Sequence, residues 1–219
     1  MKKIKHGFTL AEMLVVLGVI VFLLTILVPV MKKVTPNQDK MMLKKAYYMA
    51  ERVINELVND TELYPEPDDP VMGDWFLANT KEVRDPRTGN MVSGPTKFCE
   101  LFKARMNVLE EHTTCENSTG VGMGTSNVVS VANQKVTFTT TDGVDWYIRK
   151  GNFTGSTYIE LQIDVSGRGK GNDCFYLALD SPGKCLKPDS FWFKVYSNGR
   201  IEPYHSKTLE WLTDTKVTN

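Results

Sequence analysis

Hydrophobic and polar positions divide the 219-residue chain into four parts. The first part, Phe8–Met31, holds 24 residues of which only Glu12 is charged. About 18 or more consecutive apolar residues are enough for a helix to cross the hydrocarbon core of a membrane. The pattern therefore predicts a transmembrane helix, inside which the Glu12 carboxylate is costly unless it finds a partner.

The second part, residues 32–60, predicts an amphipathic continuation of that helix. Thr35-Pro36-Asn37-Gln38 is a helix start, with a capping threonine, a proline in the first helical position and a glutamine three residues after the cap. Apolar residues then recur three and four positions apart, which predicts one buried stripe. The stripe consists of Ala46, Met49, Ala50, Val53, Ile54, Leu57 and Val58.

The third part, residues 61–133, carries no sustained period and predicts a loop-rich region. Pro65, Pro67 and Pro70 end the helix and predict an irregular linker. Phe98–Glu111 predicts a short helix with a rough apolar stripe, and Asn117–Asn127, rich in Gly, Ser and Thr, predicts a loop.

The fourth part, residues 134–219, has the pattern of an antiparallel β-sheet. β-branched and aromatic residues gather in short runs, and Asn198-Gly199 is the strongest tight-turn dipeptide in the chain. The expected strands are 135–139, 144–148, 157–164, 191–196 and 200–202. A helix followed by four or more such strands is an α+β pattern.

A short basic leader, residues 1–7, precedes Gly7-Phe8-Thr9-Leu10-Ala11-Glu12. This stretch resembles the N-terminal signal of type IV pilins and type II secretion pseudopilins. The resemblance implies cleavage by the prepilin peptidase between Gly7 and Phe8, N-methylation of Phe8, and pairing of Glu12 with the terminal amine of a neighbouring subunit. Pro29 also stands where the family helix usually carries a proline.

Elementary geometry agrees with these roles. Gly7 is the smallest residue available at a bond that a protease must approach closely. Glu12 follows Phe8 by four residues, about one helical turn, so its carboxylate and the new N-terminus lie on one face of the helix. A neighbouring helix shifted by about one turn would bring its amine to this acid, and pairing would remove an isolated buried charge.

The resemblance implies a pilin-like fold, in which a long N-terminal helix packs on a C-terminal sheet and residues 61–133 form the variable surface region. It implies a structural subunit of a pilus-like filament or a secretion pseudopilus. The expected partners are other pilin or pseudopilin subunits, the prepilin peptidase and methyltransferase, the inner-membrane assembly platform and membrane lipid. The precursor would span the inner membrane once, and the filament would be periplasmic or extracellular.

Two other classes of protein share the hydropathy profile. A monomeric single-pass anchored binding protein would keep its N-terminus uncut and would have no need of Gly7-Phe8 or Glu12. A secreted protein with an ordinary signal peptide would carry a shorter apolar core and a small-residue cleavage site. The run here ends in Val28-Pro29-Val30-Met31 and has no such site.

The four cysteines, Cys99, Cys115, Cys174 and Cys185, predict disulfides if the domain is exported. Four cysteines allow three connectivities. We favour the local pairs Cys99–Cys115 and Cys174–Cys185, because each closes a single loop at low entropic cost. Zinc binding and free thiols are the rival uses, and the spacing does not match a Cys-x-x-Cys knuckle.

An aspartate- and glycine-rich loop follows the strand that ends at Asp164. Some pseudopilins bind calcium in a similarly placed loop, and the resemblance implies Asp164, Asn172, Asp173 and Asp189 as oxygen ligands. Calcium takes six to eight oxygens. Arg168 and Lys170 inside the loop would repel a cation, and Asp, Asn and Gly also form turns without any metal.

No catalytic arrangement is evident, so an enzyme is not expected. His112 and His205 have no evident partners for catalysis, and Gly120–Gly124 lacks the Lys-Ser/Thr of a phosphate-binding loop. Formal net charge is zero, which gives no general attraction for nucleic acid. DNA uptake by a competence pilus would need exposed cations that contact phosphates. The candidates are Lys97, Lys103 and Arg105.

Overall fold

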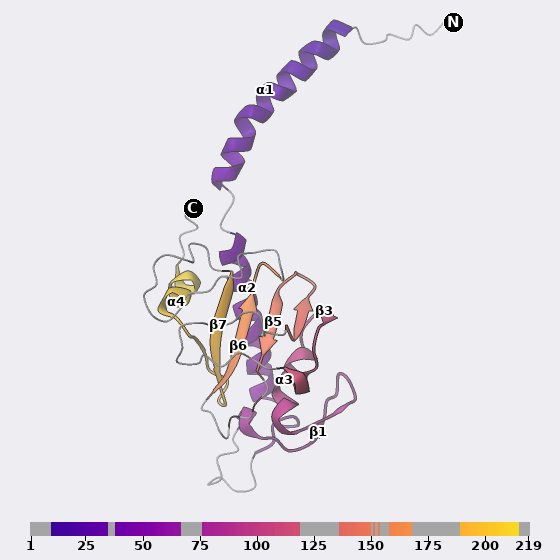
Figure 1. The fold of residues 1–219 in the computed structure, drawn as a ribbon, viewed down its shortest axis with the longest axis vertical. Coiled ribbons are helices and arrows are strands. Elements are labelled where there is room, and N and C mark those ends of the chain that lie inside the picture. The colour runs from indigo at the N-terminus through magenta and orange to yellow at the C-terminus, as the bar shows by residue number, and fades with distance from the viewer. Residues whose placement is uncertain are drawn as a thin grey trace, which may run out of the picture. The chain divides into compact units, whose positions relative to one another are not determined.

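The computed structural model describes residues 10–34, 38–66, 76–118, 136–149, 151, 153, 158–167 and 189–214. The chain forms two units, one of which contains the first helix, while the other runs from Asp39 to Thr215 (Figure 1). Gly7, Phe8 and the start signal at residues 35–37 lie outside the described residues.

Helix α1, Leu10–Val34, is the described part of the first unit. Its side chains are described from Leu10 to Thr25, and all of these residues are exposed. Among the residues that the structure describes, no helix is long and apolar enough to cross a membrane.

The second unit is an α+β domain in which α2, Gln38–Val58, lies against one face of an antiparallel sheet (Figure 1). The six strands follow one another in chain order, each paired with the next. They are β3 (Val108–Glu111), β4 (Phe138–Thr140), β5 (Asp145–Ile148), β6 (Tyr158–Asp164), β7 (Ser190–Tyr196) and β8 (Ile201–Pro203). The fold predicted from the sequence, a helix packed on an antiparallel sheet, is confirmed for this unit.

Shorter elements complete the second unit. They are β1 (Val83–Arg84) and β2 (Met91–Val92), which form a separate two-stranded sheet, the helices α3 (Lys97–Lys103) and α4 (Ser206–Thr213), and 3-10 turns at Phe76–Ala78, Gly94–Thr96 and Cys115–Asn117.

The predicted apolar stripe of α2 forms one side of the core. Its buried residues are Leu43, Ala46, Ala50, Val53, Ile54 and Leu57, while Met49 and Val58 are half-buried. On the other side, the sheet contributes Trp146, Ile148, Leu161, Ile163, Phe191, Phe193 and Val195. The Tyr47 ring meets the Phe193 ring at 5.4 Å between centroids, which places α2 over β7.

Two hairpins predicted from turn residues are present. β4 and β5 are joined through Gly143, whose φ is +82°, and β7 and β8 through Asn198-Gly199, where Gly199 has a φ of +83°. A positive φ is adopted readily only by glycine, which explains why these two turns could be located from the sequence.

The prediction of a helix over Phe98–Glu111 is wrong in its second half. α3 ends at Lys103, and Val108–Glu111 is strand β3, which pairs with β4 through Val108↔Thr140 and Glu111↔Phe138. Pairing with β4 satisfies the backbone hydrogen bonds of residues 108–111. The apolar pattern that favoured a helix there is weak, so the tertiary pairing decides the structure. α4 was not predicted.

Gly199 is expected to be intolerant of a side chain. A Cβ there would lie 2.7 Å from Val58 Cγ2 in addition to requiring a left-handed backbone. We expect Gly199→Ala to lower the free energy of unfolding by about 2–4 kcal/mol, measured by urea denaturation with tryptophan fluorescence. Gly89→Ala is the matched control, because Gly89 has a φ of +74° and nothing within 4 Å of its Cβ position. Equal losses in both variants would show that the contact with α2 is unimportant.

Candidate functional site

The first candidate site is the start of α1. Glu12 lies in the first turn of this helix, where a carboxylate interacts favourably with the helix dipole. Most residues from Met13 to Thr25 are large and apolar, and the large apolar residues from Leu10 to Leu24 are 46–80 % exposed. Helices that are apolar all round are normally buried. The described side chains of α1 are instead exposed, so this surface is a candidate contact surface.

The predicted disulfide between Cys99 and Cys115 is present, with a Cα–Cα distance of 5.8 Å. It links α3 to the 3-10 turn at Cys115–Asn117, and both cysteines are buried in the core. Cys174 and Cys185 lie outside the described residues, so their pairing stays a prediction.

Two of the four predicted calcium ligands lie close together. The Ser166 hydroxyl oxygen lies 3.0 Å from Asp164 Oδ1 and 3.3 Å from Asp189 Oδ2, and both aspartates are buried. Asn172 and Asp173 lie outside the described residues. Within the described ranges no group of three or more His, Cys, Asp or Glu residues is placed to hold a metal ion. Calcium binding stays a prediction.

The pKa of Asp164 is unusual for a carboxyl group. Burial raises the pKa of the Asp164 carboxyl to about 6, hydrogen bonds from Ser166 oppose the rise, and the nearby Asp189 and Asp145 add to it. Asp145 faces Asp164 across the β5–β6 pair. The sheet register thus places Asp145 opposite Asp164, and Asp189, directly before β7, comes near Asp164 through Ser166.

None of the three cations considered for DNA contact is well exposed. Lys97 is 1 % exposed, and its Nζ donates to the Lys81 carbonyl at 2.9 Å beneath the Tyr64 ring. The Lys103 Nζ pairs with Glu100 and Glu111 at 2.8 and 2.9 Å. The Arg105 side chain is 2 % exposed. Tertiary contacts occupy all three cations.

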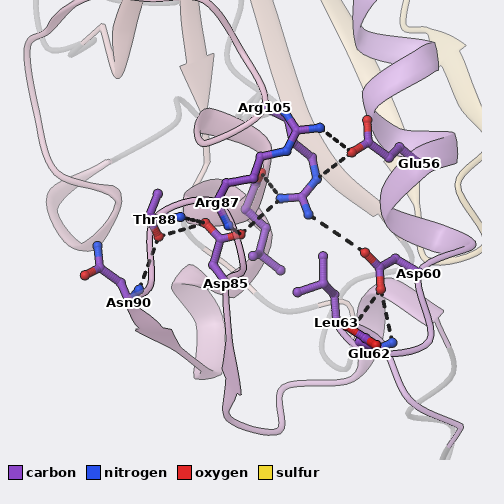
Figure 2. Close-up of polar contacts among 10 residues, drawn as sticks. Glu56, Asp60, Glu62, Leu63, Asp85, Arg87, Thr88, Asn90 and Arg105 are labelled. Carbon is purple, nitrogen blue, oxygen red and sulfur yellow. Dashed lines mark hydrogen bonds and ion pairs between the residues drawn. The ribbon is translucent and has the colours of Figure 1, made fainter.

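Arg105 is the centre of a charge network that the sequence did not reveal (Figure 2). Its Nε lies 3.2 Å from Glu56 Oε1 on α2, and its Nη1 lies 3.7 Å from Asp85 Oδ1 after β1. Nη1 also donates to the Leu101 carbonyl of α3 at 3.0 Å. Asp60, just after α2, lies 3.9 Å from Nη2. One guanidinium therefore joins the end of α2, the β1–β2 turn and α3.

Asp85 makes this network a buried one. It is 1 % exposed, and its carboxylate also accepts hydrogen bonds from the Arg87 and Thr88 amides and the Thr88 hydroxyl. Arg87 in turn pairs with Glu56 at 2.7 Å. Removing one partner of a buried ion pair typically costs about 3–5 kcal/mol because the other charge is left uncompensated. The network therefore holds its elements in one arrangement.

Lys97 should make stability depend on pH. Burial lowers the pKa of its ammonium group to about 8, below the value of the unfolded chain. Above pH 10.5 Lys97 is neutral in both the folded and the unfolded chain, so it does not lower the free energy of unfolding. As the pH falls from there through about 8, the unfolded chain binds a proton more readily than the folded chain does, and the free energy of unfolding decreases. Between pH 7 and pH 9.5 the free energy of unfolding should rise by about 2 kcal/mol, and Lys97→Met should abolish that rise.

Urea denaturation at a series of pH values measures this effect. Lys81→Met is the matched control, because it removes the same charge from an exposed residue and leaves the carbonyl that Lys97 contacts. Parallel pH profiles for the wild type and Lys97→Met would contradict the prediction.

Comparison with known proteins bears on the N-terminal site. Residues 2–28 match the family model of the prokaryotic N-terminal methylation motif. Comparisons with curated proteins and with solved structures found no match. The matched segment includes Gly7, Phe8 and Glu12 and overlaps α1 from Leu10 onward. The chain therefore carries the N-terminal signal of type IV pilins and pseudopilins.

Proposed function

We propose that this chain is a structural subunit of a type IV pilus-like filament or a type II secretion pseudopilus. The observation that carries the proposal is the methylation motif at residues 2–28. In the proposal the prepilin peptidase cuts after Gly7, Phe8 becomes N-methylated, and the helix that follows enters the filament. The partners are other pilin or pseudopilin subunits and the inner-membrane assembly platform.

The surface of α1 supports both stages of this proposal. Its described apolar side chains are exposed on all sides. In the precursor, lipid would cover them in a single pass through the inner membrane, for which the 24 residues of Phe8–Met31 suffice in length. In the filament, neighbouring helices would replace lipid, since lipid tails and apolar side chains offer similar surroundings.

Glu12 is the assembly carboxylate in this proposal. An acid within an apolar helix is expensive in lipid and in a helix bundle unless a cation pairs with it. The terminal amine of a neighbouring subunit would supply that cation. Subunits inserted out of register would leave the carboxylate unpaired, so the pair selects the correct axial position.

The second unit would form the filament surface in the periplasm or outside the cell. Its core lies within the second unit, so it is built without α1. The Cys99–Cys115 disulfide supports an oxidising compartment. The role proposed is structural and not enzymatic.

The mature N-terminus tests this function directly. Mass spectrometry of the protein from its own host should find a chain that begins with N-methylated Phe8. A chain that retains Met1 or Lys2 in the presence of the host's peptidase would overturn the proposal and favour a monomeric anchored binding protein. A chain that begins after about residue 30 would indicate an ordinary secreted protein.

Glu12→Ala should separate membrane insertion from assembly. We expect the variant to enter the membrane as well as the wild type does, because alanine is apolar, and to assemble about tenfold less because the pairing charge is lost. Immunoblots of sheared filaments and of membranes measure the two pools. Glu62→Ala, an exposed acid of the second unit, is the control. Wild-type assembly of Glu12→Ala would refute the pairing role.

A further inference from the structure

The start of α2 carries more positive charge than a helix start favours. Lys40, Lys44 and Lys45 fall within the first two turns, against one acid, Asp39. The N-terminal end of a helix has a partial positive charge, so cations there are destabilising. The dipole effect is confined to the first turn, so Lys40 is the cation that most needs a carboxylate from elsewhere in the chain.

The C-terminal end of α4 supplies most of this compensation. Lys40 Nζ lies 2.6 Å from Asp214 Oδ2, and Lys44 Nζ donates to the Asp214 backbone carbonyl at 2.6 Å. Asp214 follows α4 directly, and its amide donates to the Glu210 carbonyl. Figure 1 shows α4 at the same end of the second unit as the start of α2. A residue 174 positions away thus holds the first turns of α2.

α4 packs against the sheet of the second unit. The Trp211 ring packs against Phe191 at 5.5 Å between centroids, Leu212 is partly buried, and Thr208 is buried. Leu209 is 50 % exposed. An eight-residue helix is not stable alone in water, so α4 exists only while these contacts last.

The other end of α2 is held differently. Ile54 and Val58 lie against Gly199 at the β7–β8 turn, and Glu56 pairs with the buried Arg105. Breaking these contacts exposes core or leaves the Arg105 side chain, which is 2 % exposed, without its partner. At the start, no residue from Gln38 to Met41 is buried, and the Lys40–Asp214 pair has side chains that are 12 % and 44 % exposed. An ion pair with one half-exposed partner is weak. The start of α2 is therefore the end that opens first.

We propose that α4 and Asp214 form a releasable clasp on the start of α2. With the clasp closed, α2 is helical from Gln38. With the clasp open, residues 38–41, none of which is buried, lose their helical structure, while α2 from Met42 onward stays on the sheet through the buried Leu43. These four residues span about 6 Å as a helix and up to about 13 Å extended. The clasp thus sets how much free chain links α1 to the second unit, whether or not the protein assembles into a filament.

Amide hydrogen exchange of the full chain in detergent micelles tests the clasp. We expect Asp214→Asn and Lys40→Met each to speed exchange at residues 41–45 by about three- to tenfold, with amides of β6 and β7 unchanged. The direction is diagnostic for Lys40→Met. Removing a cation from a helix start would by itself slow exchange there, because it relieves the dipole repulsion.

Lys45→Met is the matched control. It removes the same charge from the same part of α2, but Lys45 pairs with Asp142 of the β4–β5 turn at 2.9 Å and not with Asp214. Exchange at residues 41–45 in this variant should stay within about twofold of the wild type. Unchanged exchange in Asp214→Asn, or equal acceleration in Lys45→Met, would overturn the proposal. Neither result depends on N-terminal processing.

Discussion

Burial of one face of α2 against the sheet is the interaction on which the second unit depends. Six fully buried side chains between Leu43 and Leu57 face the inward side of β5, β6 and β7. Burying a large apolar side chain contributes about 1.5–3 kcal/mol, so this contact is worth on the order of 10 kcal/mol before the loss of chain entropy. Ala46 and Ala50 lie among the larger residues and allow close approach. The other elements of the unit are arranged around this contact.

The two ends of α2 are then held by contacts of different strength. At its end, the buried Arg105 pairs with the half-exposed Glu56 and the buried Asp85, and Val58 and Ile54 lie close to Gly199. The net stability gained from such a network is small, because desolvation of the charges offsets much of their attraction. Its main effect is to favour one arrangement of the elements that it joins. At its start, Asp214 contributes one ion pair, with Lys40, in which the Asp214 side chain is 44 % exposed. No residue from Gln38 to Met41 is buried, so this end has no core contact of its own.

The proposed function assigns separate tasks to the two units. The described side chains of α1 are exposed and mainly apolar, and the described core residues all belong to the second unit. The methylation motif connects α1 with assembly, and Glu12 is the group through which register would be selected. A surface that must be covered first by lipid and later by helices cannot also serve as the core of a folded domain. This explains why the chain carries both parts.

The sequence by itself determined the features that depend on neighbours along the chain. The apolar stripe of α2 follows from a helical period, the hairpins at Gly143 and Gly199 from residues that accept a positive φ, and the N-terminal signal from a short motif. Tertiary structure decided what depends on partners far away. Residues 108–111 are a strand because β4 pairs with them, and Lys97 and Arg105 are buried because distant carbonyl and carboxylate oxygens receive their charges. The sequence does not show whether a lysine or arginine is exposed to water or buried against protein oxygens. Only the fold distinguishes an exposed cation from a buried one.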